Sequence, residues 1–324
     1  MSISLQKQLL SDADDAVQTA AYSPRKLVLI HTGVLAALNL LALALQFVLS
    51  GASEGTGGLA GLGTQAMLET AQVVLTMAMQ ILSPFWEFGL VLAALMLCRR
   101  QNPGPKSLLS GFFRFGPVLR LLILEAIIYF IAVLVAAQAG SFVYMLSPAS
   151  QPLVELTEQM MQAGSEEAML EMLQALDEGT VMSLLLDLLP YILIPALVII
   201  VPLSYRLRLA QYVVMDEQKV GAFYAISQSL RLTRKRCLQL LRLDLKLWWF
   251  YALQVVALAV CYGDMLLPQL GVTLDMNPEA ASLAFYAVGL ALQILLHWWK
   301  MPQVMTAYAG FYDRLCPQRA ENAI

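Results

Sequence analysis

Residues that commonly build catalytic and metal centres are scarce in this 324-residue chain, which has two histidines and four cysteines. The histidines, His31 and His297, lie far apart in the sequence, and neither belongs to an HExxH motif. The cysteines form no CxxC pair, so neither the spacing of a zinc site nor that of a redox dithiol is present. We therefore expect no catalytic residue, no metal and no cofactor, and a protein that is not an enzyme.

Charged residues are also few, at 13% of the chain, whereas hydrophobic residues make up 59%. A soluble domain usually has about 25% charged and about 45–50% apolar residues. The apolar residues are concentrated in six blocks, each long enough to cross a hydrocarbon core of about 30 Å as a helix. The six predicted spans are 27–49, 72–97, 117–146, 182–203, 243–262 and 281–299. The composition thus predicts an all-α membrane protein with six transmembrane helices.

Lysine and arginine are absent from the first, third and fifth connections between these spans. All 20 basic residues lie before the first span, in or beside the second and fourth connections, or after the sixth span. The other connections carry acidic residues instead, for example Glu54 and Asp264. Because lysine and arginine are enriched on the cytoplasmic side of a membrane, we expect both termini in the cytoplasm.

This topology divides the chain into three parts. Residues 1–26 form a cytoplasmic N-terminal segment, 27–315 a six-span helical membrane domain, and 316–324 a cytoplasmic tail. Within the domain, 147–181 is an acidic outer loop with two short amphipathic helices, and 206–242 is a basic cytoplasmic loop. Apolar residues also recur at helical spacing in the N-terminal segment, which predicts a helix lying on the membrane surface.

The basic loop contains a stretch, 220–236, in which Phe223, Ile226 and Leu230 recur on one helical face. Basic residues lie on the opposite face, so we expect a basic amphipathic interfacial helix, flat on the anionic inner leaflet. The candidate surface for a lipid headgroup or a membrane-protein partner consists of Arg231, Arg234, Lys235, Arg236 and Arg242. The alternative is that these charges only fix the orientation of the chain. No nucleic-acid-binding module surrounds the stretch, so we expect no nucleic-acid partner.

Ionisable residues within predicted spans are costly and are therefore functional candidates. The candidate intramembrane polar or ion site consists of Glu87, Glu125, Asp187, Asp244 and His297. One hypothesis is a cavity in which Glu87 and Glu125 bind a proton or a cation. The alternative is that each carboxyl group is neutral or paired and holds helices together. Asp244 is expected to pair with a nearby cation or with another helix.

Three segments resemble a known family. They are SGFFRFGPVLRLLIL at 110–124, AISQSLRLTRKRCLQLLRLDLKLWWFYAL at 225–253 and PQVMTAYAGFYDRL at 302–315. From about Cys98 onward the chain resembles an uncharacterised bacterial integral membrane family, the domain of unknown function nine-seven-five. The resemblance implies a multi-pass protein of the bacterial cytoplasmic (cell) membrane, and it implies no activity.

Two functional hypotheses follow from these patterns. The first is a non-enzymatic accessory or scaffold protein that binds lipid or a membrane partner through the basic surface. The alternative is a small transporter or permease that uses Glu87 and Glu125.

Overall fold

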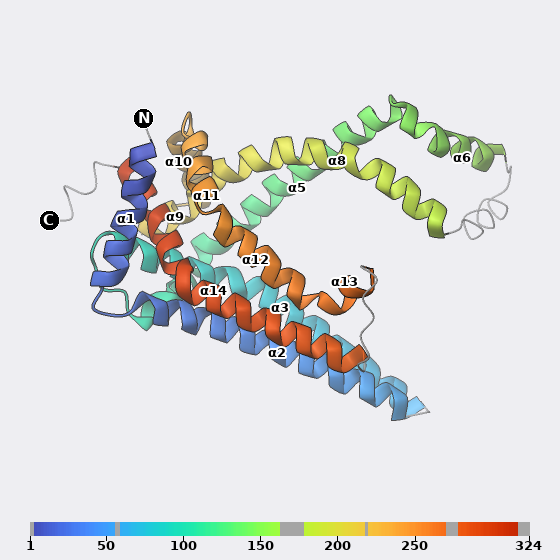
Figure 1. Ribbon diagram of the computed structural model, residues 1–324, viewed down its shortest axis with the longest axis horizontal. Coiled ribbons are helices and arrows are strands. Elements are labelled where there is room, and N and C mark those ends of the chain that lie inside the picture. The colour runs from blue at the N-terminus through green and yellow to red at the C-terminus, as the bar shows by residue number, and fades with distance from the viewer. Residues whose placement is uncertain (1–2, 56–58, 163–177, 218–219, 270–277, 317–324) are drawn as a thin grey trace. The chain divides into compact units, whose positions relative to one another are not determined.

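The computed structural model describes residues 3–55, 59–162, 178–217, 220–269 and 278–316, and within these ranges it contains helices and no strand (Figure 1). The long helices are α2 (Pro24–Gly55), α3 (Leu59–Cys98), α5 (Phe115–Met145), α8 (Glu178–Leu207) and α14 (Pro278–Leu315). The shorter helices are α1 (Ile3–Thr19), α4 (Ser110–Phe113), α6 (Gln151–Gln162), α9 (Ala210–Asp216), α10 (Ala222–Thr233), α11 (Cys237–Lys246), α12 (Trp248–Cys261) and α13 (Gly263–Gln269). Two 3-10 helices, η1 (Pro105–Leu109) and η2 (Pro148–Ser150), precede α4 and α6.

Several of these helices are long and apolar enough to cross a membrane. Within the described ranges four qualify, namely Met79–Cys98, Phe115–Met145, Met182–Asp216 and Ala281–Leu315. The pair α11 and α12 adds a fifth if its 63° bend at Leu247 belongs to one span. The remaining predicted span, 27–49, lies in α2, which is not among these helices. The protein is therefore a helical membrane protein, and its six spans and its orientation stay predictions.

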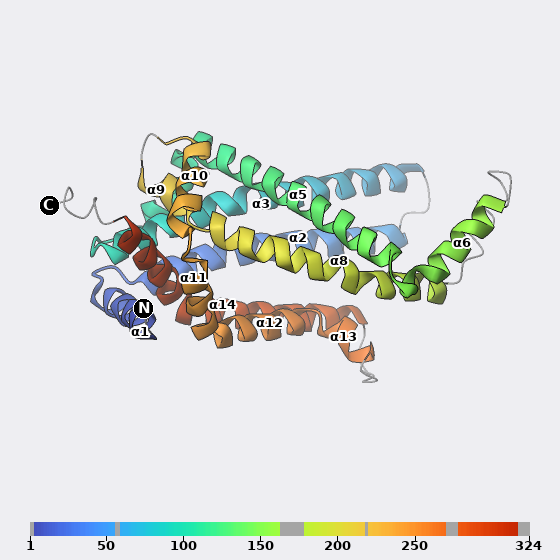
Figure 2. The same ribbon diagram turned by 90° about the horizontal axis from the view of Figure 1, so that it is seen from above.

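The chain divides into two compact units. The first consists of Met1–Leu121 and Leu209–Ile324, and the second is Leu122–Arg208. In the first unit α12 runs along α14 and α2 runs along α3 (Figures 1 and 2). Helix α14 also packs against α1, α2 and α3, so it forms the centre of this unit.

Glycines let the segment between α3 and α5 approach α3 closely. A Cβ atom on Gly111 of α4 would lie 2.9 Å from the backbone carbonyl carbon of Phe85, which is too close for any real side chain. Phe85 is fully buried and stacks on Phe115, with 4.7 Å between the ring centroids. The glycine and the aromatic residues of the 110–124 motif therefore serve to seat this segment on α3.

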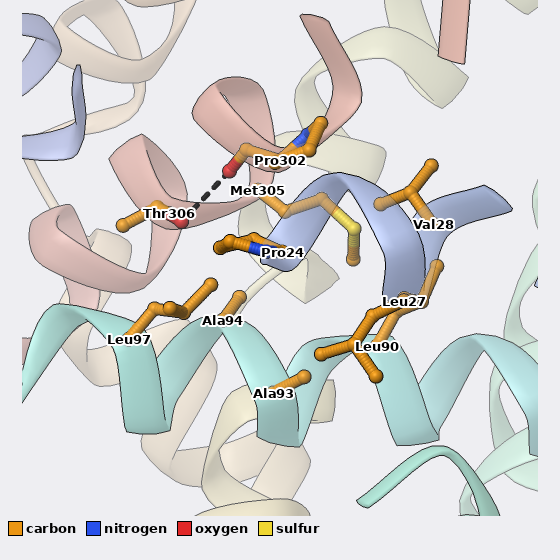
Figure 3. A pocket seen from close by; sticks show the side chains of 10 residues that line it. All are labelled: Pro24, Leu27, Val28, Leu90, Ala93, Ala94, Leu97, Pro302, Met305 and Thr306. Carbon is orange, nitrogen blue, oxygen red and sulfur yellow. Dashed lines mark hydrogen bonds between the residues drawn. The ribbon is translucent and has the colours of Figure 1, made fainter. Parts of the chain in front are cut away.

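A small apolar cavity lies between α2, α3 and α14 (Figure 3). Its volume is about 20 Å³, room for roughly one water molecule. The hydroxyl group in its wall, that of Thr306, donates a hydrogen bond of 2.7 Å to the backbone carbonyl of Pro302. Because that hydroxyl is satisfied within its own helix, the cavity offers little to a polar ligand, and we interpret it as a packing gap.

The helix predicted in the N-terminal segment is α1, but its apolar face is covered by protein. Leu9 and Ala13 are each only 2% exposed, and α1 packs against α14 and α3. Gly310 of α14 leaves room for Leu9, because a Cβ atom there would lie 3.3 Å from the leucine methyl. Arg314 and Asp12 form an ion pair of 2.7 Å between the same two helices. The apolar face of α1 therefore packs on protein, because α14 supplies a matching apolar surface, and the position of the helix at the membrane surface stays a prediction.

The second unit contains most of α5 together with α6 and α8. Helices α5 and α8 meet at Gly140, where a Cβ atom would lie 2.8 Å from the Cα atom of Ile192. Tyr144 packs edge-to-face on Tyr191, with ring centroids 5.3 Å apart. Helix α6 confirms the first of the two helices predicted in the outer loop. The second helix falls at 163–177, outside the described residues.

Candidate functional site

The basic stretch is not the continuous helix predicted over 220–236. Helix α10 ends at Thr233, and a turn of three residues separates it from α11. Lys235 has a φ angle of 65°, a left-handed conformation that a right-handed helix cannot contain. The turn is hydrogen-bonded, since the backbone N–H of Arg236 donates to the carbonyl of Thr233 at 2.9 Å. The Thr233 hydroxyl in turn donates to the carbonyl of Ser229 at 2.8 Å.

The buried face of α10 also differs from the predicted apolar face. Its buried residues are Ala222, Ala225, Ile226, Ser229 and Thr233, which recur at helical spacing. Small side chains at most of these positions let α10 pack closely on α9. Phe223, expected on the apolar face, is 79% exposed. Helix α10 is therefore held by protein on one face and presents an aromatic ring on another.

Four cationic side chains surround a hollow of about 470 Å³ at the turn between α10 and α11. The lining residues are Arg231 of α10, Arg234, Lys235 and Arg236 of the turn, together with Leu232 and Leu315. None of the four cationic side chains has a hydrogen bond or an ion pair with any other residue that the structure describes. Like charges held together repel each other. The hollow is therefore suited to an anion that relieves this repulsion.

Arg242 belongs to the predicted basic surface but does not line the hollow. It lies on α11 and is exposed, and the lining of the hollow comes from α10, the turn and the end of α14. The structure thus brings four of the five predicted surface residues together and leaves the fifth apart.

A second charged cluster, which no pattern in the sequence marks, joins neighbouring elements of the same unit. Arg99, which directly follows α3, contacts Asp216 of α9 at 2.5 Å and Asp313 of α14 at 2.7 Å. Tyr312 donates a hydrogen bond of 3.1 Å to Asp216. The hydrogen bond to Asp216, followed by that to Asp313, raises the pKa of Arg99 above its ordinary value and outweighs desolvation. Arg99 therefore stays charged and links three helices; its partners are too far away in the sequence for spacing to reveal them.

The predicted intramembrane site is divided between the two units. Glu87, Asp244 and His297 belong to the first unit, and Glu125 and Asp187 to the second. Glu87 and Asp187 are exposed, whereas the other three are partly buried. Neither unit therefore holds both Glu87 and Glu125, the pair expected to bind a proton or a cation.

Asp244 pairs with other helices, which is one of the two alternatives expected for it. The Tyr308 hydroxyl of α14 donates a hydrogen bond to the Asp244 carboxylate. The Tyr251 hydroxyl of α12 lies 2.9 Å from that of Tyr308 and 3.5 Å from the carboxylate. The two tyrosines thereby connect α11, α12 and α14 at the 63° bend.

His297 has a separate polar partner, Gln254 of α12, whose side-chain nitrogen lies 3.0 Å from Nε2 of the imidazole. The sequence carries a weak signal for these contacts. Tyr251 and Gln254 are three residues apart, and His297 and Tyr308 are eleven apart, so each pair shares one face of its helix. Polar side chains of α12 and α14 therefore face each other at two positions along the helices, Tyr251 with Tyr308 and Gln254 with His297.

The charged groups form two arrangements that can bind a small ligand. Within the part of the chain that the structure describes, no three His, Cys, Asp or Glu side chains come together as metal ligands. The hollow offers four hydrogen-bond-donating cations to an anion, and the contacts of Asp244 offer hydroxyl groups and a carboxylate to a proton or a cation.

Comparison with known proteins gives one match. Residues 28–319 match the family described as "Protein of unknown function (DUF975)". No curated protein and no solved structure matches the chain. The matched range includes all three motifs at 110–124, 225–253 and 302–315, and it extends N-terminally beyond the resemblance that began near Cys98. The chain therefore belongs to the DUF975 family.

Proposed function

We propose that this protein is a non-enzymatic accessory protein of the bacterial cytoplasmic membrane, and that it acts by binding anionic lipid through the basic surface at the turn between α10 and α11. The observation that carries the proposal is the hollow with its four cations, which have no side-chain partner among the described residues. Each basic residue near an anionic leaflet contributes about 1 kcal/mol. Four of them together correspond to roughly a thousandfold in membrane affinity.

Exposed apolar side chains next to the cations support a lipid over a soluble ligand. Phe223 on α10 is 79% exposed and Leu238 on α11 is 67% exposed. Cationic side chains beside aromatic and aliphatic ones are typical of helices at the boundary between headgroups and acyl chains. With both termini in the cytoplasm, this surface would face the leaflet that carries most anionic lipid.

Native mass spectrometry of the detergent-purified protein tests this function. Wild type is expected to retain anionic lipid, and a variant with Arg231, Arg234, Lys235 and Arg236 all changed to glutamine is expected to lose it. Quantification of co-purifying proteins in the same samples tests the other partner class. If a protein is retained in stoichiometric amount and no anionic lipid is bound, the partner of this surface is a protein and not a lipid. The proposal fails if wild type retains neither.

A small transporter is the second candidate, and the polar contacts of α14 with α11 and α12 favour it. Asp244 with Tyr308, and His297 with Gln254, form two polar levels in a region of apolar helices. In proteoliposomes carrying a pH-sensitive dye, a proton-coupled transporter should produce a proton flux that Asp244→Asn, Glu87→Gln or Glu125→Gln reduces. For an accessory protein we expect no flux above that of empty vesicles, and all three variants should behave like wild type.

A further inference from the structure

We propose that the hollow at the turn between α10 and α11 is a binding site for a phosphate group that carries close to two negative charges, as a phosphomonoester does. This inference rests on the proposed function and names the ligand chemistry of its surface. The binding groups are the side chains of Arg231, Arg234, Lys235 and Arg236.

The backbone of the turn is what makes these four cations a site. Successive residues of an α-helix point about 100° apart, so a continuous helix would spread Arg234, Lys235 and Arg236 around its surface. The helical path ends at Arg234, whose ψ angle of 122° is extended, and the left-handed Lys235 completes the turn, so that all three side chains line the same hollow. Arg231, in the last turn of α10, completes it.

Arg236, which lines the hollow, also lies at the N-terminus of α11. Arg236 occupies the N-cap position of this ten-residue helix, and no side chain caps it. The first backbone N–H groups of a helix lack partners within the helix, and they lie at the positive end of its dipole. Phosphate groups bind at such positions. No residue of α11 itself lines the hollow, so its binding groups are the four side-chain cations.

The number of charges favours a phosphomonoester over a phosphodiester or a carboxylate. A phosphomonoester carries about −1.5 to −2 at pH 7 and has three strong acceptor oxygens. A phosphodiester or a carboxylate carries one negative charge and would leave more of the repulsion among the four cations unrelieved. Arginine guanidinium groups, of which there are three here, can bind phosphate oxygens in pairs. The volume of about 470 Å³ is within the range of about 300–1,000 Å³ common for ligand pockets.

The phosphate can belong to a lipid headgroup or to a soluble molecule, and the surroundings favour the lipid. Leu232 and Leu315 line the hollow between the cations. Leu238, two residues beyond the turn, is 67% exposed. Apolar side chains at the rim of a phosphate site suit a headgroup whose acyl chains continue into the membrane.

The test uses full-length protein in nanodiscs and in vesicle flotation, with phosphatidic acid and phosphatidylglycerol compared at equal mole fraction in phosphatidylcholine. Wild type is expected to bind phosphatidic acid at least tenfold more tightly. Arg234→Gln and Lys235→Gly should abolish that preference. Lys235→Gly is suited to the purpose, because glycine adopts the left-handed conformation readily and the turn should persist. Arg242→Gln is the matched control, since it removes one exposed charge outside the hollow and should keep the preference.

A pH series gives a second readout. The second ionisation of a phosphomonoester has a pKa near 6, so affinity for phosphatidic acid should rise as the pH increases from 5 to 8. Affinity for phosphatidylglycerol should stay level over that range. The charges that line the hollow from α10 and the turn are three arginines and one lysine, and α14 contributes only Leu315.

The outcomes separate this inference from the proposed function. Equal losses in Arg234→Gln and Arg242→Gln, or equal binding of the two lipids, would overturn the phosphate site and leave a generic anionic-lipid surface. Binding to neither vesicle, and no binding of inorganic phosphate to the detergent-purified protein, would overturn both. Binding of inorganic phosphate alone, lost in Arg234→Gln, would support the site and identify a soluble phosphate as its source.

Discussion

Arg99 is the residue on which the packing of three helices in the first unit depends. It lies within ion-pair distance of Asp216 and Asp313, and the Asp216 side chain is only 9% exposed. Removing the guanidinium would take one cation from a nearly buried carboxylate, which would keep its hydrogen bond from Tyr312.

We expect Arg99→Ala to lower the free energy of unfolding by about 1–3 kcal/mol. Arg99→Lys should lose less, because it keeps the charge and loses only the two-pronged geometry. Thermal unfolding in detergent measures both variants. An unchanged melting temperature for Arg99→Ala would show that the two aspartates do not depend on this residue.

Gly111 and Gly116, five residues apart in one motif, differ in the space around them. A Cβ atom on Gly111 would meet the backbone of Phe85, whereas one on Gly116 has nothing within 4 Å. Gly111→Ala should therefore destabilise the protein by about 1–3 kcal/mol through overpacking. Gly116→Ala, in the first turn of α5, should be neutral or slightly stabilising, because alanine is the better helix former. Thermal unfolding of the pair compares them directly, and similar behaviour would contradict the close approach of α4 to α3.

At the scale of helices, the bend between α11 and α12 is held by the contacts of Asp244. Tyr308→Phe removes the hydroxyl group that donates to the Asp244 carboxylate, while the ring remains. Because hydrogen bonds to charged groups contribute about 1.5–3 kcal/mol, we expect a loss of stability of roughly that size. Tyr224→Phe is the control, since Tyr224 is exposed on α10. Equal melting temperatures for the two variants would mean that Tyr308 does not support the bend.

At the scale of the whole molecule, the prediction concerns which side of the membrane each loop faces. A cysteine replacing Glu158 of α6 should react with an impermeant maleimide in intact cells. A cysteine replacing Lys235 in the basic turn should react only after permeabilisation. The parent for both is a variant without the four native cysteines, Cys98, Cys237, Cys261 and Cys316. The reverse labelling pattern would show that two predictions are wrong: that the termini lie in the cytoplasm, and that the basic surface faces the inner leaflet.

The sequence by itself determined the helical membrane class, the approximate extent of the long helices and the family. These follow from local properties, because an apolar run of sufficient length must pair its own backbone groups as a helix in lipid. The amphipathic character of α1 and the concentration of basic residues at 231–242 are equally local, and both were predicted from periodicity and composition.

Only the tertiary structure decided which of these residues meet. Asp244 is bonded by a residue 64 positions away, and Arg99 by residues 117 and 214 positions away, distances over which helical periodicity carries no information. The apolar face of α1 packs on α14 because the two surfaces are complementary. The sequence of one surface does not reveal its complement. The non-helical conformations of Arg234 and Lys235 form a turn where the periodicity predicted a continuous helix, and this turn places its three cations beside Arg231 of α10. Packing selects such conformations through neighbours that are remote in the sequence.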